Sequence, residues 1–171
     1  MKLGRVGVIG RFKPLHNGGA VMLEAICEKS EHAIIGIGSS NKYNLRNPFT
    51  AEETEAMIDA FLSKKFSNYE FVHVPDFAQD PKYADGQKWR EYVTEVFGEL
   101  DAFVTGNAYV RDLFQEDYQI IHPAFLIDKE NHVKLRATEV RVKMAQGDDG
   151  WKSLVPAEVV GYITEHKFDD R

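Results

Sequence analysis

The sequence has a single cysteine, Cys27, among 171 residues. One thiol excludes an intrachain disulfide framework and a cysteine-rich metal site. The sequence also lacks any apolar run that approaches the length of a membrane span, which is about 20 residues. The first residues, MKLGRVGVIGRF, lack the apolar core of a signal peptide. These absences predict a cytoplasmic protein with no membrane partner.

The sequence has fewer basic than acidic residues. It contains 21 Lys and Arg residues and 27 Asp and Glu residues, which gives a net charge of −6 and an isoelectric point near 5.5. This balance argues against nucleic acid as a partner, because nucleic-acid binders are usually basic. A small phosphorylated ligand remains compatible with it, since a few local arginines can bind one. The length and an apolar content of 43% predict one globular domain over residues 1–171.

Apolar runs alternate with segments of helical periodicity along the chain. The predicted strands are Arg5–Ile9, Ala33–Ile37, Tyr69–Val74, Ala102–Thr105 and Tyr118–Ile121. The predicted helices are Gly19–Glu28, Thr50–Leu62, Gln87–Phe97, Tyr109–Phe114, Thr138–Gln146 and Pro156–His166. This alternation predicts an α/β fold: a Rossmann-like, doubly wound parallel sheet of about five strands, helices on both faces and C-terminal helices from about residue 138. Ligands of such sheets bind beyond the carboxyl ends of the strands, so we expect the site in the loops after the first, second and fourth strands.

The loop after the first strand carries the strongest local signal. It runs from Gly10 to Gly19 and combines glycines with Arg11, Lys13 and His16 immediately before a helix. Free amides and the dipole at a helix start attract anions, and glycine lets the backbone approach a ligand closely. The loop therefore predicts a phosphate site, although a glycine-rich turn with solvated charges would share this spacing.

The run Gly10–Gly18, GRFKPLHNG, resembles the G-R-F-x-P-x-H-x-G-H motif of the nucleotidyltransferase superfamily, in particular the archaeal-type nicotinamide mononucleotide (NMN) adenylyltransferases. Further matches to that family follow in the same order: Gly36–Ser39, Arg46–Thr50, Thr105–Asn107, Ala137–Arg141 and the tail from Leu154 to Ile163. Because the matches span nearly the whole chain, the resemblance is specific.

The resemblance implies transfer of AMP from ATP to NMN by direct in-line attack, which gives NAD and pyrophosphate. ATP as the substrate implies Mg²⁺, and the sequence shows no ligand cluster that would form a metal site in the protein. The resemblance also implies a homo-oligomer. The residues that it places in catalysis are His16, Arg11, Arg46 and Arg141. Those that it places around ATP or NAD are Gly10, Phe12, Gly18, Gly36, Gly38, Ser39, Thr105, Gly106, Asn107 and Thr138. Those near the acceptor are Pro75, Asp76 and Trp89, although Trp89 also fits an apolar helix stripe with Tyr92, Val93, Val96 and Phe97.

The residue pattern adds an argument for Arg141. It lies in the first turn of the helix predicted from Thr138, where a cation is unfavourable unless an anion binds there. Thr138 itself is expected to cap this helix.

The sequence departs from the family pattern at four positions. Gly19 replaces the second histidine, Arg136 replaces a serine, Thr54 replaces an arginine, and Gly86 replaces an asparagine three residues before Trp89. The loss at Gly19 bears on the catalytic rate, and the segment from Phe77 to Lys88 bears on the acceptor. The alternatives are therefore another phosphorylated acceptor (nicotinate mononucleotide or phosphopantetheine) or a catalytically weakened nucleotide-binding protein. A nucleotide-free structural domain would leave Arg141 unexplained.

Overall fold

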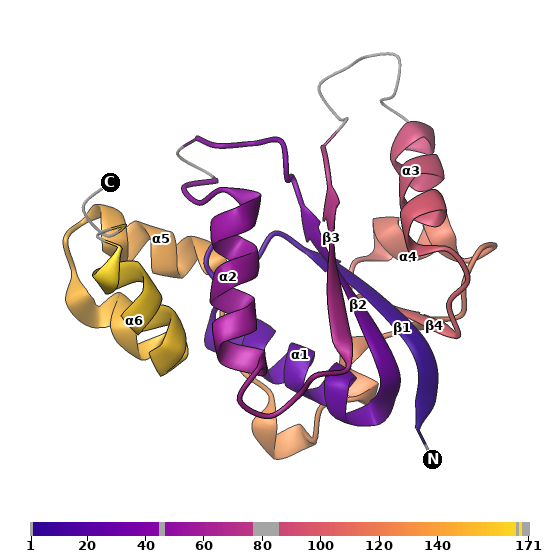
Figure 1. Ribbon diagram of the computed structural model, residues 1–171, viewed down its shortest axis with the longest axis horizontal. Coiled ribbons are helices and arrows are strands. Elements are labelled where there is room, and N and C mark those ends of the chain that lie inside the picture. The colour runs from indigo at the N-terminus through magenta and orange to yellow at the C-terminus, as the bar shows by residue number, and fades with distance from the viewer. Residues whose placement is uncertain (1, 45–46, 77–85, 167, 169–171) are drawn as a thin grey trace.

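The computed structural model describes residues 2–44, 47–76, 86–166 and 168. These residues form a five-stranded parallel sheet with the strand order β3-β2-β1-β4-β5 (Figure 1). The strands are β1 (Leu3–Gly10), β2 (Ser30–Gly38), β3 (Tyr69–Val74), β4 (Ala102–Val104) and β5 (Ile120–Ile121). The predicted α/β class with a doubly wound sheet is confirmed.

Strand β1 lies at the centre of the sheet. It pairs with β2 from Leu3 to Gly10, and on its other side it pairs with β4 from Val6 to Val8. The chain builds outward from β1 through β2 to β3, then crosses to β4 and β5. The direction of winding therefore reverses between β1 and β4, and the loops that follow these two strands diverge to opposite faces.

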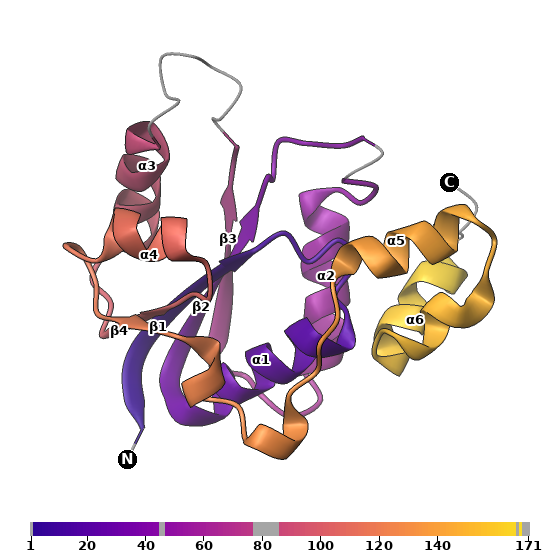
Figure 2. The ribbon, with the colours of Figure 1, turned by 180° about the vertical axis from the view of Figure 1, so that it is seen from behind.

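Helices cover both faces of the sheet (Figures 1 and 2). Helices α1 (Asn17–Lys29) and α2 (Ala51–Leu62) pack on one face, where Leu23 and Met57 join a buried cluster with Val8. Helices α3 (Gln87–Phe97) and α4 (Ala108–Phe114) cover the other face through a second cluster. Burial on both faces explains why the central strands read as nearly continuous apolar runs.

The C-terminal segment extends the α2 side of the molecule (Figure 1). Two short 3-10 turns, η2 (Pro123–Phe125) and η3 (Lys129–Asn131), lead to α5 (Ala137–Ala145), η4 (Asp149–Ser153) and α6 (Ala157–Glu165). Val159 and Ile163 of α6 join the cluster beneath α2, and Lys64 binds Glu158 at 3.0 Å. None of the helices in the described ranges is long and apolar enough to cross a membrane.

The observed elements differ from the predicted ones in several details. Strand β2 begins at Ser30 and ends at Gly38, so Gly36 lies inside the strand rather than after it. Strand β5 is shorter than predicted. Val96 is 37% exposed, whereas Val93 and Phe97 are buried, because residues four apart share a helix face and Val96 lies beside that stripe.

Helix α2 begins with a capping box. The Thr50 hydroxyl accepts a hydrogen bond from the Glu53 amide at 3.1 Å, and the Glu53 carboxylate accepts one from the Thr50 amide at 2.9 Å.

We expect Thr50→Ala to lower the free energy of unfolding by about 1 kcal/mol, because an amide of the first turn loses its acceptor. Thr50→Ser keeps the hydroxyl and should stay near the wild type in urea denaturation. Equal midpoints for the alanine and serine variants would contradict this account.

Candidate functional site

A cavity of about 440 Å³ opens at the carboxyl edge of the sheet, where the winding direction reverses. The ends of β1, β2 and β4 form its floor, and α3 and α4 form one wall. Its lining residues are Ile9, Gly10, Arg11, Gly38, Ser39, Asp76, Gly86, Trp89, Phe103, Thr105, Asn107, Tyr109 and Val110. The loops predicted to carry the site thus converge on one cavity.

The cavity brings together residues that were predicted from distant parts of the chain. Those that line it are Gly10, Arg11, Gly38, Ser39, Asp76, Trp89, Thr105 and Asn107. Predicted residues outside the lining are Phe12, His16, Gly18, Gly36, Pro75, Gly106, Thr138 and Arg141. Arg46, which was predicted to be catalytic, lies outside the described residues.

The turn after β4 is held by its own side chains. The Thr105 hydroxyl accepts a hydrogen bond from the Asn107 amide, and the Asn107 side chain accepts one from the Val110 amide, each at 3.1 Å. Asn107 therefore caps α4 while it lines the cavity. This local capping aims the first turn of α4, with Tyr109 and Val110, at the cavity.

Trp89 lies both in the apolar cluster beneath α3 and on the wall of the cavity, the two environments that were considered for it from the sequence. Its ring packs edge to face on Phe114, with centroids 5.3 Å apart, and joins the cluster beneath α3. It is only partly buried and lines the cavity. One face of the site is therefore an aromatic surface fixed by the core.

Gly36 has a packing role in the structure. It is buried within β2, and a Cβ there would lie 2.8 Å from Cζ of Phe97 and 2.9 Å from Cγ1 of Ile9. Phe12 is likewise buried, and its ring lies where a side chain at Gly10 would be. Packing beside the cavity thus accounts for Gly36 and Phe12 without a ligand.

His16 lies at the start of α1 and caps it. Its Nδ1 accepts a hydrogen bond from the Gly19 amide at 3.1 Å. In the neutral ring this assigns the proton to Nε2, which is then a donor. Burial lowers the pKa of His16 below 6.5; the Glu139 carboxylate opposes this shift and the Arg141 guanidinium adds to it. His16 is therefore a neutral hydrogen-bond donor near pH 7.

The start of α5 corrects two predictions. The helix begins at Ala137, and the Arg136 amide donates to the Glu139 carboxylate at 2.9 Å, so Thr138 does not cap it. Arg141 is the fifth helical residue and lies in the second turn, so the argument from a cation in the first turn does not apply. Instead, Arg141 donates to the Lys13 carbonyl at 3.0 Å and to the Thr138 hydroxyl at 3.2 Å.

Positive charges gather beside the cavity. Arg11 lies close enough to Lys13 and Arg141 to lower the pKa of each, although burial is the larger cause for both. Across the described part of the chain, no carboxylate forms an ion pair with Arg11, Lys13 or Arg141. Like charges repel, so this cluster favours a bound anion.

Lys13 was expected to add a cation for the anion. Its charge lies near Arg11, but its side chain is fully buried, does not line the cavity and donates to the carbonyls of Ser39 and Lys42. Sequence reasoning also missed Ile9, Gly86, Phe103, Tyr109 and Val110 in the lining. Tyr109, an aromatic residue two positions after Asn107, was the available signal. The described ranges contain no group of three His, Cys, Asp or Glu that could bind a metal ion.

A protein family and curated relatives match most of this chain. A family described as cytidylyltransferase-like matches residues 8–143. The nicotinamide-nucleotide adenylyltransferase of Thermococcus sibiricus is 38% identical over 169 residues, which cover 95% of this chain and 84% of that protein. The enzyme of the same name from Methanococcus aeolicus is 32% identical, with 98% and 92% covered.

A solved structure shares the fold. It is a bifunctional NMN adenylyltransferase/ADP ribose pyrophosphatase from Francisella tularensis, complexed with AMP and a manganese ion. The TM-score is 0.75 at 24% identity, and the match covers 99% of this chain. The present chain spans about half the length of that protein, with 50% covered.

Gly36 and Gly38 give a matched pair of alanine variants. Gly36→Ala should lower the free energy of unfolding by about 1–3 kcal/mol, because the methyl group overpacks against Phe97. At Gly38 the nearest atom to a new Cβ is Cγ2 of Ile9 at 3.4 Å, an ordinary contact, and the residue lines the cavity. Gly38→Ala should therefore keep the stability and weaken ligand binding. Urea denaturation and calorimetry with ATP separate the two, and equal stability of the variants would refute the packing assignment.

The His16 assignment predicts a pH dependence of stability. Since the folded-state pKa lies below 6.5, the unfolded chain binds more protons below that value, and stability falls as the pH drops through the folded-state pKa. His16→Asn keeps a cap acceptor without a titrating ring, so its unfolding free energy should vary less between about pH 7.5 and about pH 5. His16→Ala should lose about 1 kcal/mol at pH 7. Parallel pH profiles for the wild type and His16→Asn would count against the buried neutral ring.

Proposed function

Because the chain belongs to the cytidylyltransferase-like family, we propose that it is a nicotinamide-nucleotide adenylyltransferase, which transfers AMP from ATP to NMN and releases pyrophosphate. The observation that carries the proposal is the cluster of Arg11, His16 and Arg141 with no described carboxylate partner for its guanidinium groups. It adjoins a cavity with an aromatic wall at the switch point of the sheet. That combination suits a ligand with phosphates at one end and a ring at the other.

The proposed reaction needs alignment more than a chemical group from the protein. An oxygen of the NMN phosphate attacks the α-phosphorus of ATP, the bond to the bridging oxygen breaks, and pyrophosphate leaves with that electron pair. The attacking oxygen already carries charge, so no covalent enzyme intermediate and no strong general base are required. The protein must hold the two phosphates in line and neutralise the charge that develops.

The described residues have distinct proposed roles in that step. The guanidinium groups of Arg11 and Arg141 would bind phosphate oxygens, and the Nε2 proton of His16 would donate to another. The first turn of α1 adds backbone amides beside His16. Arg46 remains a proposed phosphate ligand through the family resemblance alone.

The cavity itself would hold the nucleoside parts. Trp89 offers a fixed ring face for the acceptor base, with Asp76 beside it in the lining. Ser39, Thr105 and Asn107 line the same cavity and supply hydrogen-bonding groups for adenosine. Magnesium would enter as part of the ATP substrate, bound by phosphate oxygens.

Gly19 supports a second candidate, a protein that binds adenine nucleotides with little turnover. No imidazole can reach the phosphates from this position, and loss of one such donor lowers rates by about 10²-fold or more. Pyrophosphate release with ATP, Mg²⁺ and a panel of NMN, nicotinate mononucleotide and phosphopantetheine separates the candidates. Release that depends on NMN supports the proposed enzyme, and release with another acceptor changes the substrate. Binding of ATP by calorimetry without release would favour the second candidate.

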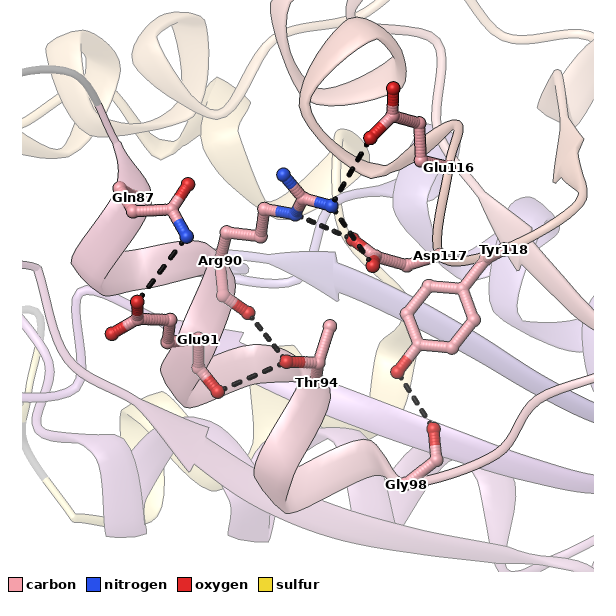
Figure 3. A network of polar contacts seen from close by, with 8 residues as sticks. All are labelled: Gln87, Arg90, Glu91, Thr94, Gly98, Glu116, Asp117 and Tyr118. Atoms are coloured by element: carbon pink, nitrogen blue, oxygen red, sulfur yellow. Dashed lines mark hydrogen bonds and ion pairs between the residues drawn. The ribbon is translucent and has the colours of Figure 1, made fainter.

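Arg141→Ala tests the phosphate site. We expect kcat/KM to fall by about 10²-fold, because a donor to the reacting phosphates is lost. The matched control is Arg90→Ala. Arg90 is an arginine of α3 whose guanidinium binds Asp117 at 2.7 and 3.1 Å and does not line the cavity (Figure 3). The control should keep the wild-type kcat/KM. An unchanged ATP affinity and rate in Arg141→Ala would remove Arg141 from the site.

A further inference from the structure

Lys13 is an unusual residue for the interior of a protein. Its side chain is 0% exposed and is among the largest fully buried side chains in the described ranges. The ammonium group donates to the Ser39 carbonyl at 2.9 Å and to the Lys42 carbonyl at 3.3 Å. Burial, with Arg11 nearby, lowers the pKa of Lys13 to about 8. The folded state therefore resists this charge, and stability alone would be served by an apolar side chain of the same shape.

The two acceptors lie in the turn that follows β2. Ser39 has a left-handed backbone, with φ 50°, and lines the cavity. The Lys42 amide donates back to the Ser39 carbonyl at 3.0 Å, and the Ser40 amide donates to Val74 at 3.1 Å. A left-handed serine is an unfavourable conformation that its surroundings must maintain. The Lys13 ammonium supplies part of that support from the buried side of the turn.

The same turn reaches a second part of the cavity wall. The Asn41 side chain donates to the Asp76 carbonyl at 3.1 Å and accepts from the Asp76 amide at 2.8 Å. Asp76 also lines the cavity. Movement of the turn from Ser39 to Lys42 would therefore displace both the end of β2 and Asp76, the second residue after β3.

The backbone of Lys13 makes a separate connection. Its carbonyl accepts the hydrogen bond from Arg141. One residue thus links the turn that lines the cavity to the guanidinium group beside it, through two different atoms.

We propose that Lys13 is a positioning residue of the site: its side chain fixes the turn from Ser39 to Lys42 against the cavity, while its carbonyl orients Arg141. The expected change in KM rests on the proposed function, whereas the expected loosening of the turn from Ser39 to Lys42 does not. Replacing the side chain removes only the first link, because the carbonyl remains. Lys13→Met should therefore weaken substrate binding more than the chemical step.

The test compares Lys13→Met with Lys29→Met. The side-chain ammonium group of Lys29 also donates a hydrogen bond to a backbone carbonyl, that of Leu126. Neither Lys29 nor Leu126 lines the cavity. In Lys13→Met we expect KM for the nucleotides to rise about 10-fold with kcat within about 3-fold, and hydrogen exchange at the Ser40 and Lys42 amides to accelerate about 10-fold. Lys13→Arg, which keeps charged donors, should restore much of the protection. Lys29→Met should leave KM and these two amides unchanged.

The outcomes are separable. Wild-type KM and wild-type exchange in Lys13→Met would overturn the inference, and so would an equal rise of KM in Lys29→Met. If Lys13→Met does not unfold cooperatively, Lys13→Gln, which keeps a donor of shorter reach, is measured in its place. If the wild type releases no pyrophosphate, the proposed function fails on its own. Hydrogen exchange and ATP affinity by calorimetry then still decide the role of Lys13.

Discussion

The pairing of β1 with β2 on one side and β4 on the other is the constraint from which the site follows. Parallel strands need crossover helices, and the reversal of winding at β1 sends α1 and α4 to opposite faces. The loops after β1 and β4 therefore diverge, and the cavity lies between them. Side chains from five separate segments meet there because every strand ends at the same edge. The chemistry of the site is then a matter of which residues those loop ends carry.

Charge is the second constraint. Arg11, Lys13 and Arg141 lie together with no described carboxylate paired to them, so the free protein carries a repulsion that an anionic ligand would relieve. The fold limits this repulsion by giving two of the cations backbone or hydroxyl acceptors: Arg141 has the Lys13 carbonyl and Thr138, and Lys13 has the turn after β2. Those bonds also fix the direction of each group. Donors that are oriented before the ligand binds need no reorganisation when charge develops on a phosphate.

The fold class and the edge of the sheet where the cavity lies could be predicted from sequence because they depend on apolar runs and on the geometry of parallel sheets. Predictions failed where a hydrogen bond or packing contact with another residue could not be recognised in the sequence. The start of α5 depends on the bond between the Arg136 amide and Glu139, which moves Thr138 into the helix and Arg141 into its second turn. Lys13 read as a cation for the ligand because its acceptors lie 26 and 29 positions away in sequence. Gly36 was predicted to lie beside the nucleotide, and the sequence could not show that Phe97 from α3 also occupies the space left by its missing side chain.

Gly19 stands where the family pattern has a second histidine, and this difference affects the positive charge near the start of α1. Its amide holds Nδ1 of His16, which leaves Nε2 as the donor, so this position contributes through the backbone. A Cβ at Gly19 would lie 3.3 Å from Cδ1 of Leu15, which is buried beneath the loop, so a larger side chain requires that core residue to shift. With no second imidazole and a neutral His16, the positive charge available to phosphates near the start of α1 comes from guanidinium groups. In the proposed reaction, Arg11 and Arg141 would therefore carry more of the charge neutralisation than they would beside two histidines.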